Sequence, residues 1–152
     1  MTDAAQDPLE DIVDSIDIDA PIGTVWRALS EPESVRQWLG CLQYDAKIGH
    51  VFYMQPDEAR REQGDIEGAT HCEVLVLEPN DRMEFSWYMP DTPKTLVSIR
   101  LVENNPGTTT VLLTHSGWDQ FPREAVEDFW QKLKSGWSSF VLPKLKVHAE
   151  AQ

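Results

Sequence analysis

The last third of the chain contains a strand followed directly by one long amphipathic helix, and this pair constrains the fold more than any other feature. Residues 110–118 (TVLLTHSGW) have the composition of a strand, and a helix is predicted from about Pro122 to about Ala149. Its apolar residues recur at intervals of three and four and share one face, namely Val126, Phe129, Trp130, Leu133, Trp137, Phe140, Val141 and Leu145. At about 1.5 Å per residue the helix would be roughly 40 Å long. A face of that length favours a space enclosed between the helix and a curved sheet.

Pro143 lies inside this predicted helix. A proline in a helix has no backbone N–H to donate, and its ring clashes with the carbonyl group four residues earlier, here that of Ser139. We therefore expect the helix to kink, or to end early, near Val141.

The N-terminal region predicts a tail followed by one strand. Residues 1–10 are expected to form a flexible tail, and residues 11–150 a single domain, because 152 residues are enough for one hydrophobic core. Apolar and polar residues alternate from Ile12 to Ile18. This period of two is typical of a strand with one buried face.

Two short helices are expected after this strand. The first is predicted over residues 21–29, with Pro21 in its first turn. Residues 30–33 (SEPE) have the pattern of a capping box, in which the Ser30 hydroxyl accepts from the amide of Glu33. The second helix would then run to about residue 39.

From Tyr44 onward the sequence predicts strands separated by turns. The strands are expected at residues 51–54, 66–77, 83–88, 96–103 and 110–118, with 66–77 the longest. Residues 55–63 are interpreted as a charged loop, and 78–81 (EPND) and 104–107 (NNPG) as turns. Together with the helices, this order predicts an α+β fold with helices on one side of an antiparallel sheet.

The net charge of the chain argues against two classes of partner. There are 26 acidic and 13 basic residues, which give a formal charge of −13. Such a surface repels nucleic-acid phosphates and anionic membranes. The N-terminus lacks the basic start and apolar run of a signal peptide, and no apolar stretch approaches the ~20 residues of a membrane helix. We expect a cytoplasmic protein without nucleic-acid or membrane partners.

Groups suited to covalent or metal chemistry are few. Cys41 and Cys72 do not make a disulfide framework and lack metal-ligand spacing, so reduced thiols are expected. The four histidines, His50, His71, His115 and His148, also lack the spacing of a zinc site. The sequence contains no motif for a nucleophilic serine, a phosphate loop or a dinucleotide. We therefore expect neither a metal nor a cofactor.

Four segments in order resemble a known family. They are residues 20–33 (APIGTVWRALSEPE), 82–87 (RMEFSW), 113–118 (LTHSGW) and 136–140 (GWSSF). Their sequence and order resemble the SRPBCC (START/birch-pollen-allergen-like) superfamily, and within it the branch named for the activator of heat-shock protein 90 ATPase homologue. The resemblance implies a helix-grip fold. In that fold a curved antiparallel sheet of about six to seven strands, with two short helices, holds a long C-terminal helix across it and a cavity in between.

The walls of this implied cavity would come from the sheet and the long helix. The candidates are Phe85, Trp87, Val97, Ile99, Val111, Leu113, His115, Phe129, Trp130, Leu133 and Trp137. The alternative is that these side chains pack against one another as an ordinary core. Six tryptophans are difficult to pack solidly in 152 residues, which favours a cavity for the set as a whole.

His115 is the polar residue that stands out among these candidates. Strand alternation places it on the same face as Val111 and Leu113, where an imidazole could orient a ligand or act as an acid or base. The alternative is a core histidine whose two nitrogens have partners within the protein. His71 has a similar but weaker claim, shared with Glu73.

Three functions remain open at this point. The first is binding of a small hydrophobic or amphipathic molecule in the cavity. The second is an interaction module of co-chaperone or stress type, with a chaperone or another protein as its partner. The third is an enzyme of the cyclase or dehydratase kind that uses His115 or His71. No catalytic constellation is visible in the sequence, so the enzyme has the least support.

Overall fold

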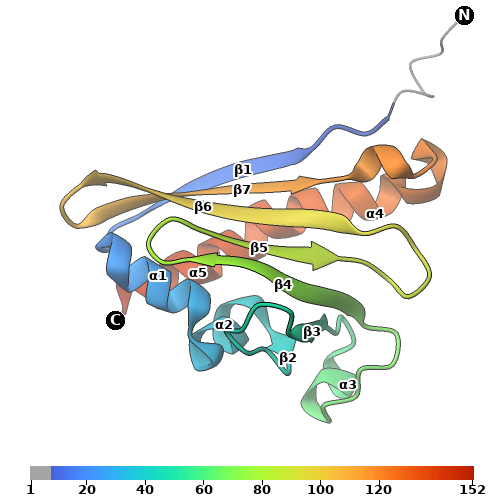
Figure 1. The fold of residues 1–152 in the computed structure, drawn as a ribbon, viewed down its shortest axis with the longest axis horizontal. Helices are drawn as coiled ribbons and strands as arrows, with labels where there is room; N and C mark the ends of the chain where they lie inside the picture. Colours follow the sequence, from blue (N-terminus) through green and yellow to red (C-terminus); the bar gives the residue numbers. More distant parts are fainter. Residues whose placement is uncertain (1–7) are drawn as a thin grey trace, which may run out of the picture.

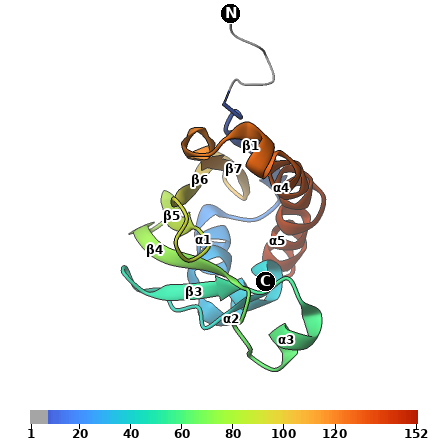
Figure 2. The ribbon, with the colours of Figure 1, turned by 90° about the vertical axis from the view of Figure 1, so that its right-hand side faces the viewer.

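Seven antiparallel strands form a sheet that curls around the C-terminal helix in the computed structural model, which describes residues 8–152 (Figures 1 and 2). The sheet order is β1-β7-β6-β5-β4-β3-β2, so the first strand of the chain pairs with the last. The strands are β1 (Ile12–Ile18), β2 (Cys41–Leu42), β3 (Val51–Met54), β4 (Thr70–Glu78), β5 (Arg82–Trp87), β6 (Thr95–Asn105) and β7 (Thr108–Ser116). The predicted α+β helix-grip fold is confirmed.

Alternation in the strands places the core as the sequence indicates. In β1, Ile12 and Ile18 are buried whereas Val13 is exposed. In β6, Val97 and Ile99 are fully buried. Side chains on these positions point to one face of the sheet because the period of a strand is two. That face is covered by the C-terminal helix and the two short N-terminal helices.

The longest strand is not the predicted one. β6 has 11 residues, and β4 begins at Thr70, four residues after the expected start. The reason lies in the preceding segment, which folds back on itself. The Gln55 side chain donates to the carbonyl oxygens of Asp65 and Glu67, each at 2.9 Å. Gly68 follows with a left-handed φ of +78°, which glycine adopts without strain.

The predicted charged loop contains a short helix, α3 (Glu58–Glu62). Asp57 caps this helix, because its side chain accepts from the backbone N–H of Arg60 at 3.0 Å. The Arg60 guanidinium then pairs with Asp65 at 3.0 Å. None of the α3 residues is buried, so this helix leaves no apolar stripe in the sequence.

The predicted capping box does not form. Helix α1 (Ile22–Ser30) ends at Ser30, whose hydroxyl donates to the carbonyl oxygen of Trp26 at 2.8 Å. Helix α2 (Pro32–Leu39) instead has Glu31 as its N-cap residue, with no side-chain cap hydrogen bond, and Pro32 in its first turn. The Ser30 side chain is thus already used by the helix that it ends.

The C-terminal helix continues through Pro143 rather than ending before it. It consists of α4 (Arg123–Gly136), a π-helical segment (Trp137–Val141) and α5 (Leu142–Glu150). Within the π-helical segment the N–H of Leu142 donates to the carbonyl oxygen of Trp137, five residues earlier. Of the two alternatives expected near Val141, a kink or an early end, the early end does not occur, because the wider turn lets the chain pass Pro143 as the start of a new α-helical segment.

The π-helical segment also changes which residues face the sheet. Trp137 and Leu142, five positions apart, are both buried, and Leu145 follows at the normal spacing of three. Phe140 was predicted to lie on the buried stripe but is 63% exposed. The stripe in the sequence assumes a constant period, and the extra residue in this turn brings Leu142 rather than Phe140 onto the buried face.

The start of the described chain is packed rather than loose. Leu9 is buried, and the carbonyl oxygen of Glu10 accepts from Trp130 Nε1 at 2.9 Å. Most of the predicted tail, residues 1–7, lies outside the described residues. Over residues 8–152, no helix combines the length and the apolar character that crossing a membrane requires.

Candidate functional site

Most of the predicted cavity residues are packed in the core. Those that are 0% exposed are Phe85, Val97, Ile99, Val111, Leu113 and His115, and Trp137 is 2% exposed. On α4, by contrast, Trp130 and Leu133 are half-buried and Phe129 is 43% exposed. Most of the sheet candidates thus lie in the packed core, whereas the α4 candidates keep part of their surface exposed.

A cavity of about 140 Å³ lies at the end of the sheet where α4 begins. β5 and β7 end there and β6 starts, as Figure 1 shows. The lining residues are Thr70, Trp87, Tyr88, Met89, Thr92, Pro93, Thr95, Trp118, Phe121, Val126 and Phe129. Only Trp87 and Phe129 were among the predicted residues. No charged side chain belongs to this lining.

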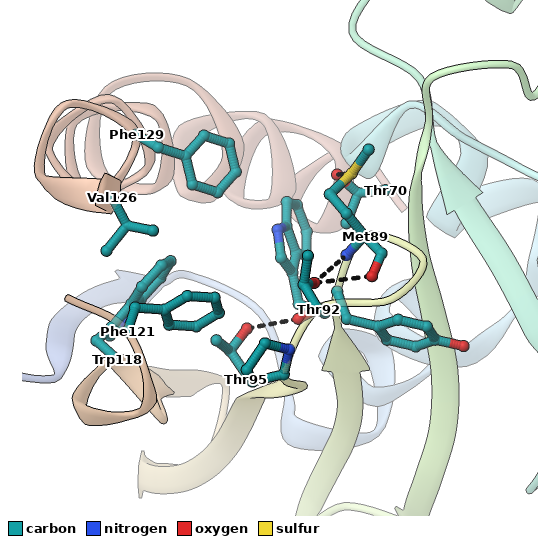
Figure 3. Close-up of a pocket in the computed structure, with 11 residues that line it drawn as sticks. Thr70, Met89, Thr92, Thr95, Trp118, Phe121, Val126 and Phe129 are labelled. Carbon is teal, nitrogen blue, oxygen red and sulfur yellow. Dashed lines mark hydrogen bonds between the residues drawn. The ribbon is translucent and has the colours of Figure 1, made fainter.

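Three stretches of the chain that are distant in sequence build the cavity wall, namely Thr70 at the start of β4, residues 87–95 and residues 118–129. Figure 3 shows Val126 and Phe129 of α4 on one side and Met89 of the β5–β6 connection on the other. Trp118 and Phe121 come from the turn between β7 and α4. Two sequence signals fall at these places, namely the turn at residues 90–93 and the Gly-Trp pair after β7. They indicate where strands end, but they do not indicate that these strand ends lie together.

Gly117 allows the turn after β7 to approach the start of β6. Its φ is +99°, and a Cβ atom there would lie 3.2 Å from the Cα of Thr95. Both the backbone conformation and the close approach favour glycine. The turn is then held by Gln120, whose Nε2 donates to the carbonyl oxygens of Lys94 and Gly117 at 2.8 and 2.9 Å. This places Trp118 on the cavity wall.

His115 is the centre of a buried chain of hydrogen bonds directly beside the cavity. Trp137 Nε1 donates to His115 Nδ1 at 3.3 Å, and His115 Nε2 lies 2.8 Å from Thr95 Oγ1. The Thr95 hydroxyl donates to the carbonyl oxygen of Trp87 at 2.7 Å. Because that hydroxyl proton is already used, Thr95 accepts from His115, which fixes the neutral Nε2–H tautomer.

The environment of His115 disfavours its charged form. Burial lowers the pKa of its imidazole from 6.5 to about 3. The rings of Trp87, Trp118 and Trp137 surround it with centroid distances of 4.8–6.2 Å. Both ring nitrogens are occupied by side chains of the protein itself, so neither is available to exchange a proton with a ligand. The geometry corresponds to the core histidine that the sequence left as an alternative.

His71 lies elsewhere. It is half-buried, between Tyr53 and Tyr88, with ring centroid distances of 5.0 and 5.6 Å. Its neighbour Cys72 is fully buried, so strand alternation places His71 on the opposite face of the sheet from the core. The structure does not bring His71 and His115 together in one site.

The two cysteines are buried and unpaired. Burial raises the pKa of Cys41 to about 12 and raises the pKa of Cys72 well above its usual range. A thiol with a raised pKa is a poor nucleophile and a poor metal ligand. Residues 8–152 also contain no group of three or more His, Cys, Asp or Glu side chains that could hold a metal ion.

One polar group of the cavity wall is left without a partner. Trp87 lines the cavity and is 7% exposed, and its Nε1–H makes no hydrogen bond with any of the residues that the structure describes. The same holds for Tyr44 Oη and His148 Nε2, which belong to residues outside the cavity lining. Buried polar atoms without partners are uncommon in native proteins.

Comparisons with known proteins identify relatives of this arrangement. The family model described as Activator of Hsp90 ATPase homolog 1-like protein matches residues 19–150. No match was found among curated proteins.

Several solved structures share the fold. Protein MLL2253 from Mesorhizobium loti is 27% identical, with a TM-score of 0.73 over 94% of this chain and 98% of that one. Protein BH1534 from Bacillus halodurans is 26% identical, with a TM-score of 0.70 over 94% of this chain and 99% of that one. An Aha1 dimer from Colwellia psychrerythraea, at 22% identity, has a TM-score of 0.69 over 93% and 97% of the two chains and shows the fold alone.

Proposed function

Since the chain belongs to the family of Activator of Hsp90 ATPase homolog 1-like proteins in the SRPBCC superfamily, we propose that it binds a small, uncharged, apolar molecule in the cavity at the α4 end of the sheet. The observation that carries the proposal is the cavity itself, about 140 Å³ in volume and lined by aromatic, aliphatic and threonine side chains. Family membership alone does not identify a ligand, because one fold serves many functions.

The size of the cavity limits the ligand. An engineered apolar cavity of about 150 Å³ stays dry and binds benzene or xenon. A cavity of about 140 Å³ therefore suits a molecule with one ring. Pockets for drug-sized ligands are larger, about 300–1,000 Å³. A long lipid or a sterol does not fit this space without a large movement of α4.

The nature of the lining limits the charge of the ligand. Transfer of an ionised group from water into an apolar site is very unfavourable unless an opposite charge is present. None of the lining residues carries a charge. The ligand that the site favours is therefore neutral.

Filling the cavity tests this proposal. Val126→Phe adds a ring to a residue of the cavity wall, whereas Val147→Phe adds the same ring to a residue of α5 that is 70% exposed. We expect isothermal titration with toluene to show saturable binding to the wild type and to Val147→Phe, and none to Val126→Phe. Absence of saturable binding to the wild type would contradict the proposal, as would unchanged binding to Val126→Phe.

A second candidate function is protein interaction of the co-chaperone type, and one observation favours it. Phe140 and Val147 are 63% and 70% exposed and line a groove on the outer side of the C-terminal helix together with Pro143. Exposed apolar side chains that cluster in this way often mark protein contacts. The family description and the formal charge of −13 suggest a chaperone of the Hsp90 type with a basic surface as the partner.

Surface plasmon resonance with purified Hsp90 from the same source tests this second candidate. Phe140→Ser removes apolar surface at the groove, whereas Val13→Ser removes an exposed apolar side chain on β1. We expect measurable binding that Phe140→Ser weakens and Val13→Ser does not. Equal binding by both variants, or none by the wild type, would rule out this groove as the contact site.

A further inference from the structure

We infer that the ligand carries a hydrogen-bond acceptor, such as a neutral carbonyl oxygen, that accepts from Trp87 Nε1. This inference rests on the proposed function and narrows it from any small apolar molecule to ring-sized ketones, aldehydes, esters or ethers. It starts from the position of Trp87, which ends β5, lines the cavity and is 7% exposed.

The Trp87 indole is rigidly placed. Its ring contacts His115 and Trp137 edge to face, with centroid distances of 5.5 and 5.6 Å. Its carbonyl oxygen is fixed by the Thr95 hydroxyl at 2.7 Å. The N–H group therefore cannot turn easily toward another partner in the core. A ligand that reaches it meets a donor whose direction is already set, which lowers the entropy cost of binding.

The neighbouring polar groups of the wall are already satisfied. Thr95 bonds to His115 and to the backbone, as described above. The Thr92 hydroxyl donates to the carbonyl oxygen of Met89 at 2.7 Å and accepts from its N–H at 3.1 Å. Trp118 Nε1 donates to the carbonyl oxygen of His115 at 3.0 Å. Trp87 Nε1 is the donor in this group that lacks a partner among residues 8–152.

A water molecule is a poor acceptor for this donor. A stably buried water makes about three hydrogen bonds. Trp87 would supply one, and the hydroxyl protons of Thr70, Thr92 and Thr95 are already donated to Met89 Sδ and to backbone carbonyl oxygens. A carbonyl oxygen on an apolar frame needs only the single donor, and the rest of the molecule matches the aromatic and aliphatic wall.

Two probes of the same shape test the inference. Acetophenone and α-methylstyrene are both substituted benzenes and differ by a carbonyl oxygen in place of a methylene group. The tryptophan indole N–H signals are observed by ¹H–¹⁵N correlation NMR during titration of the wild-type protein. The signal of Trp87 is assigned as the one missing from the Trp87→Phe spectrum.

The expected result has two parts. Acetophenone shifts the Trp87 N–H signal downfield in a saturable way, and α-methylstyrene does not. The ratio of the two affinities, acetophenone over α-methylstyrene, is also about five-fold larger for the wild type than for Trp87→Phe. About five-fold is the value expected for one net hydrogen bond. If Trp87→Phe does not fold, the Trp87 signal is assigned from triple-resonance spectra of the wild type, and the two wild-type titrations decide the question.

Two outcomes would overturn the inference, and they differ in what else they overturn. If both probes bind with equal affinity and the Trp87 N–H signal responds alike to both, the cavity binds apolar molecules without using this donor, and the proposed function stands. If neither probe shows saturable binding to the wild type, the proposed function fails and the inference fails with it.

Discussion

The two halves of the C-terminal helix carry the same kind of apolar stripe in different surroundings. α5 buries Leu142, Leu145 and Ala149, each at most 1% exposed, whereas none of the 14 residues of α4 is fully buried. α5 is also fixed to β1, because Lys146 Nζ donates to the carbonyl oxygen of Asp17 at 2.7 Å. Figure 2 shows the helix along the open side of the curled sheet.

This difference comes from what lies opposite each half. α1, α2 and β1 pack against α5 and close that end of the fold. At the other end α4 faces the β5–β6 connection and the turn after β7, which leave the cavity between them. An amphipathic stripe therefore predicts that a helix covers apolar surface, but not whether that surface is a core or a cavity wall. We refer to the two ends below as the closed end and the cavity end.

Matched leucine substitutions should show the largest difference between the two ends. Leu145 at the closed end is fully buried, and Leu133 on α4 is half-buried. Leu145→Ala should lower the free energy of unfolding by about 4 kcal/mol, because removal of an enclosed leucine leaves a void. Leu133→Ala should cost about 1 kcal/mol, because a half-buried leucine removes less apolar surface from water. Urea denaturation measures both, and equal losses would contradict the division into two ends.

The pH dependence of stability should show that the fold keeps His115 neutral in its chain of hydrogen bonds beside the cavity. The pKa of His115 is about 3 in the folded protein and 6.5 without its surroundings. The unfolded state therefore binds the proton more readily, so this contribution is complete above pH 6.5 and is lost as pH falls toward 3. Between pH 6.5 and pH 4 the loss should be about 3 kcal/mol, at about 1.4 kcal/mol per pH unit.

His115→Gln is the control for this prediction, because other groups also titrate in acid. Glu150 has a lowered pKa, chiefly from its hydrogen bond with Lys146, and loses that contribution as pH falls. The prediction therefore concerns the difference between wild type and His115→Gln in urea denaturation from pH 7 to pH 4. A parallel decline of both proteins would show that His115 is not kept neutral by the fold.

Gly117 should be sensitive to a single methyl group. A Cβ atom there would lie 3.2 Å from the backbone of Thr95, and φ is +99°. Gly117→Ala should therefore cost about 2 kcal/mol, from backbone strain and the displaced turn. Thermal denaturation measures the loss. The loss of stability should be accompanied by weaker toluene binding, because Trp118 moves with the turn. If Gly117→Ala were as stable as the wild type, the turn after β7 would not stabilise the cavity end.

Gly136 should behave in the opposite way. A Cβ atom at this position would have no neighbour within 4 Å, and the residue has helical φ and ψ of −63° and −43°. Gly136→Ala should raise the free energy of unfolding by about 1 kcal/mol or slightly less, because alanine favours helix. Thermal denaturation measures the gain. A loss would show that the junction with the π-helical segment requires glycine.

The sequence was sufficient to predict the architecture but not the site, and particular residues show why. Ile12–Ile18 and the segment with Val97 and Ile99 were assigned from a period of two, which depends only on local geometry. The π-helical segment was missed because its five-residue step between the buried Trp137 and Leu142 departs from the constant helical period that a sequence pattern assumes.

The sequence predicts a cavity but not its position, for a related reason. Its wall joins Thr70, Met89, Thr95, Trp118 and Phe121, which come from the ends of four strands. No local pattern indicates that these ends meet beside α4. The predicted cavity residues come from the sheet face and the helix stripe that the helix-grip fold brings together. That fold alone does not determine at which end of the helix the core is closed and at which end a cavity remains.

The most direct test of this account is the crystal structure of the protein under xenon pressure. Xenon occupies apolar cavities of this size. The account predicts one xenon atom between Trp87, Trp118 and Phe129 at the cavity end, and none beneath α5 near Leu145. Xenon beneath α5, or none at the cavity end, would contradict it.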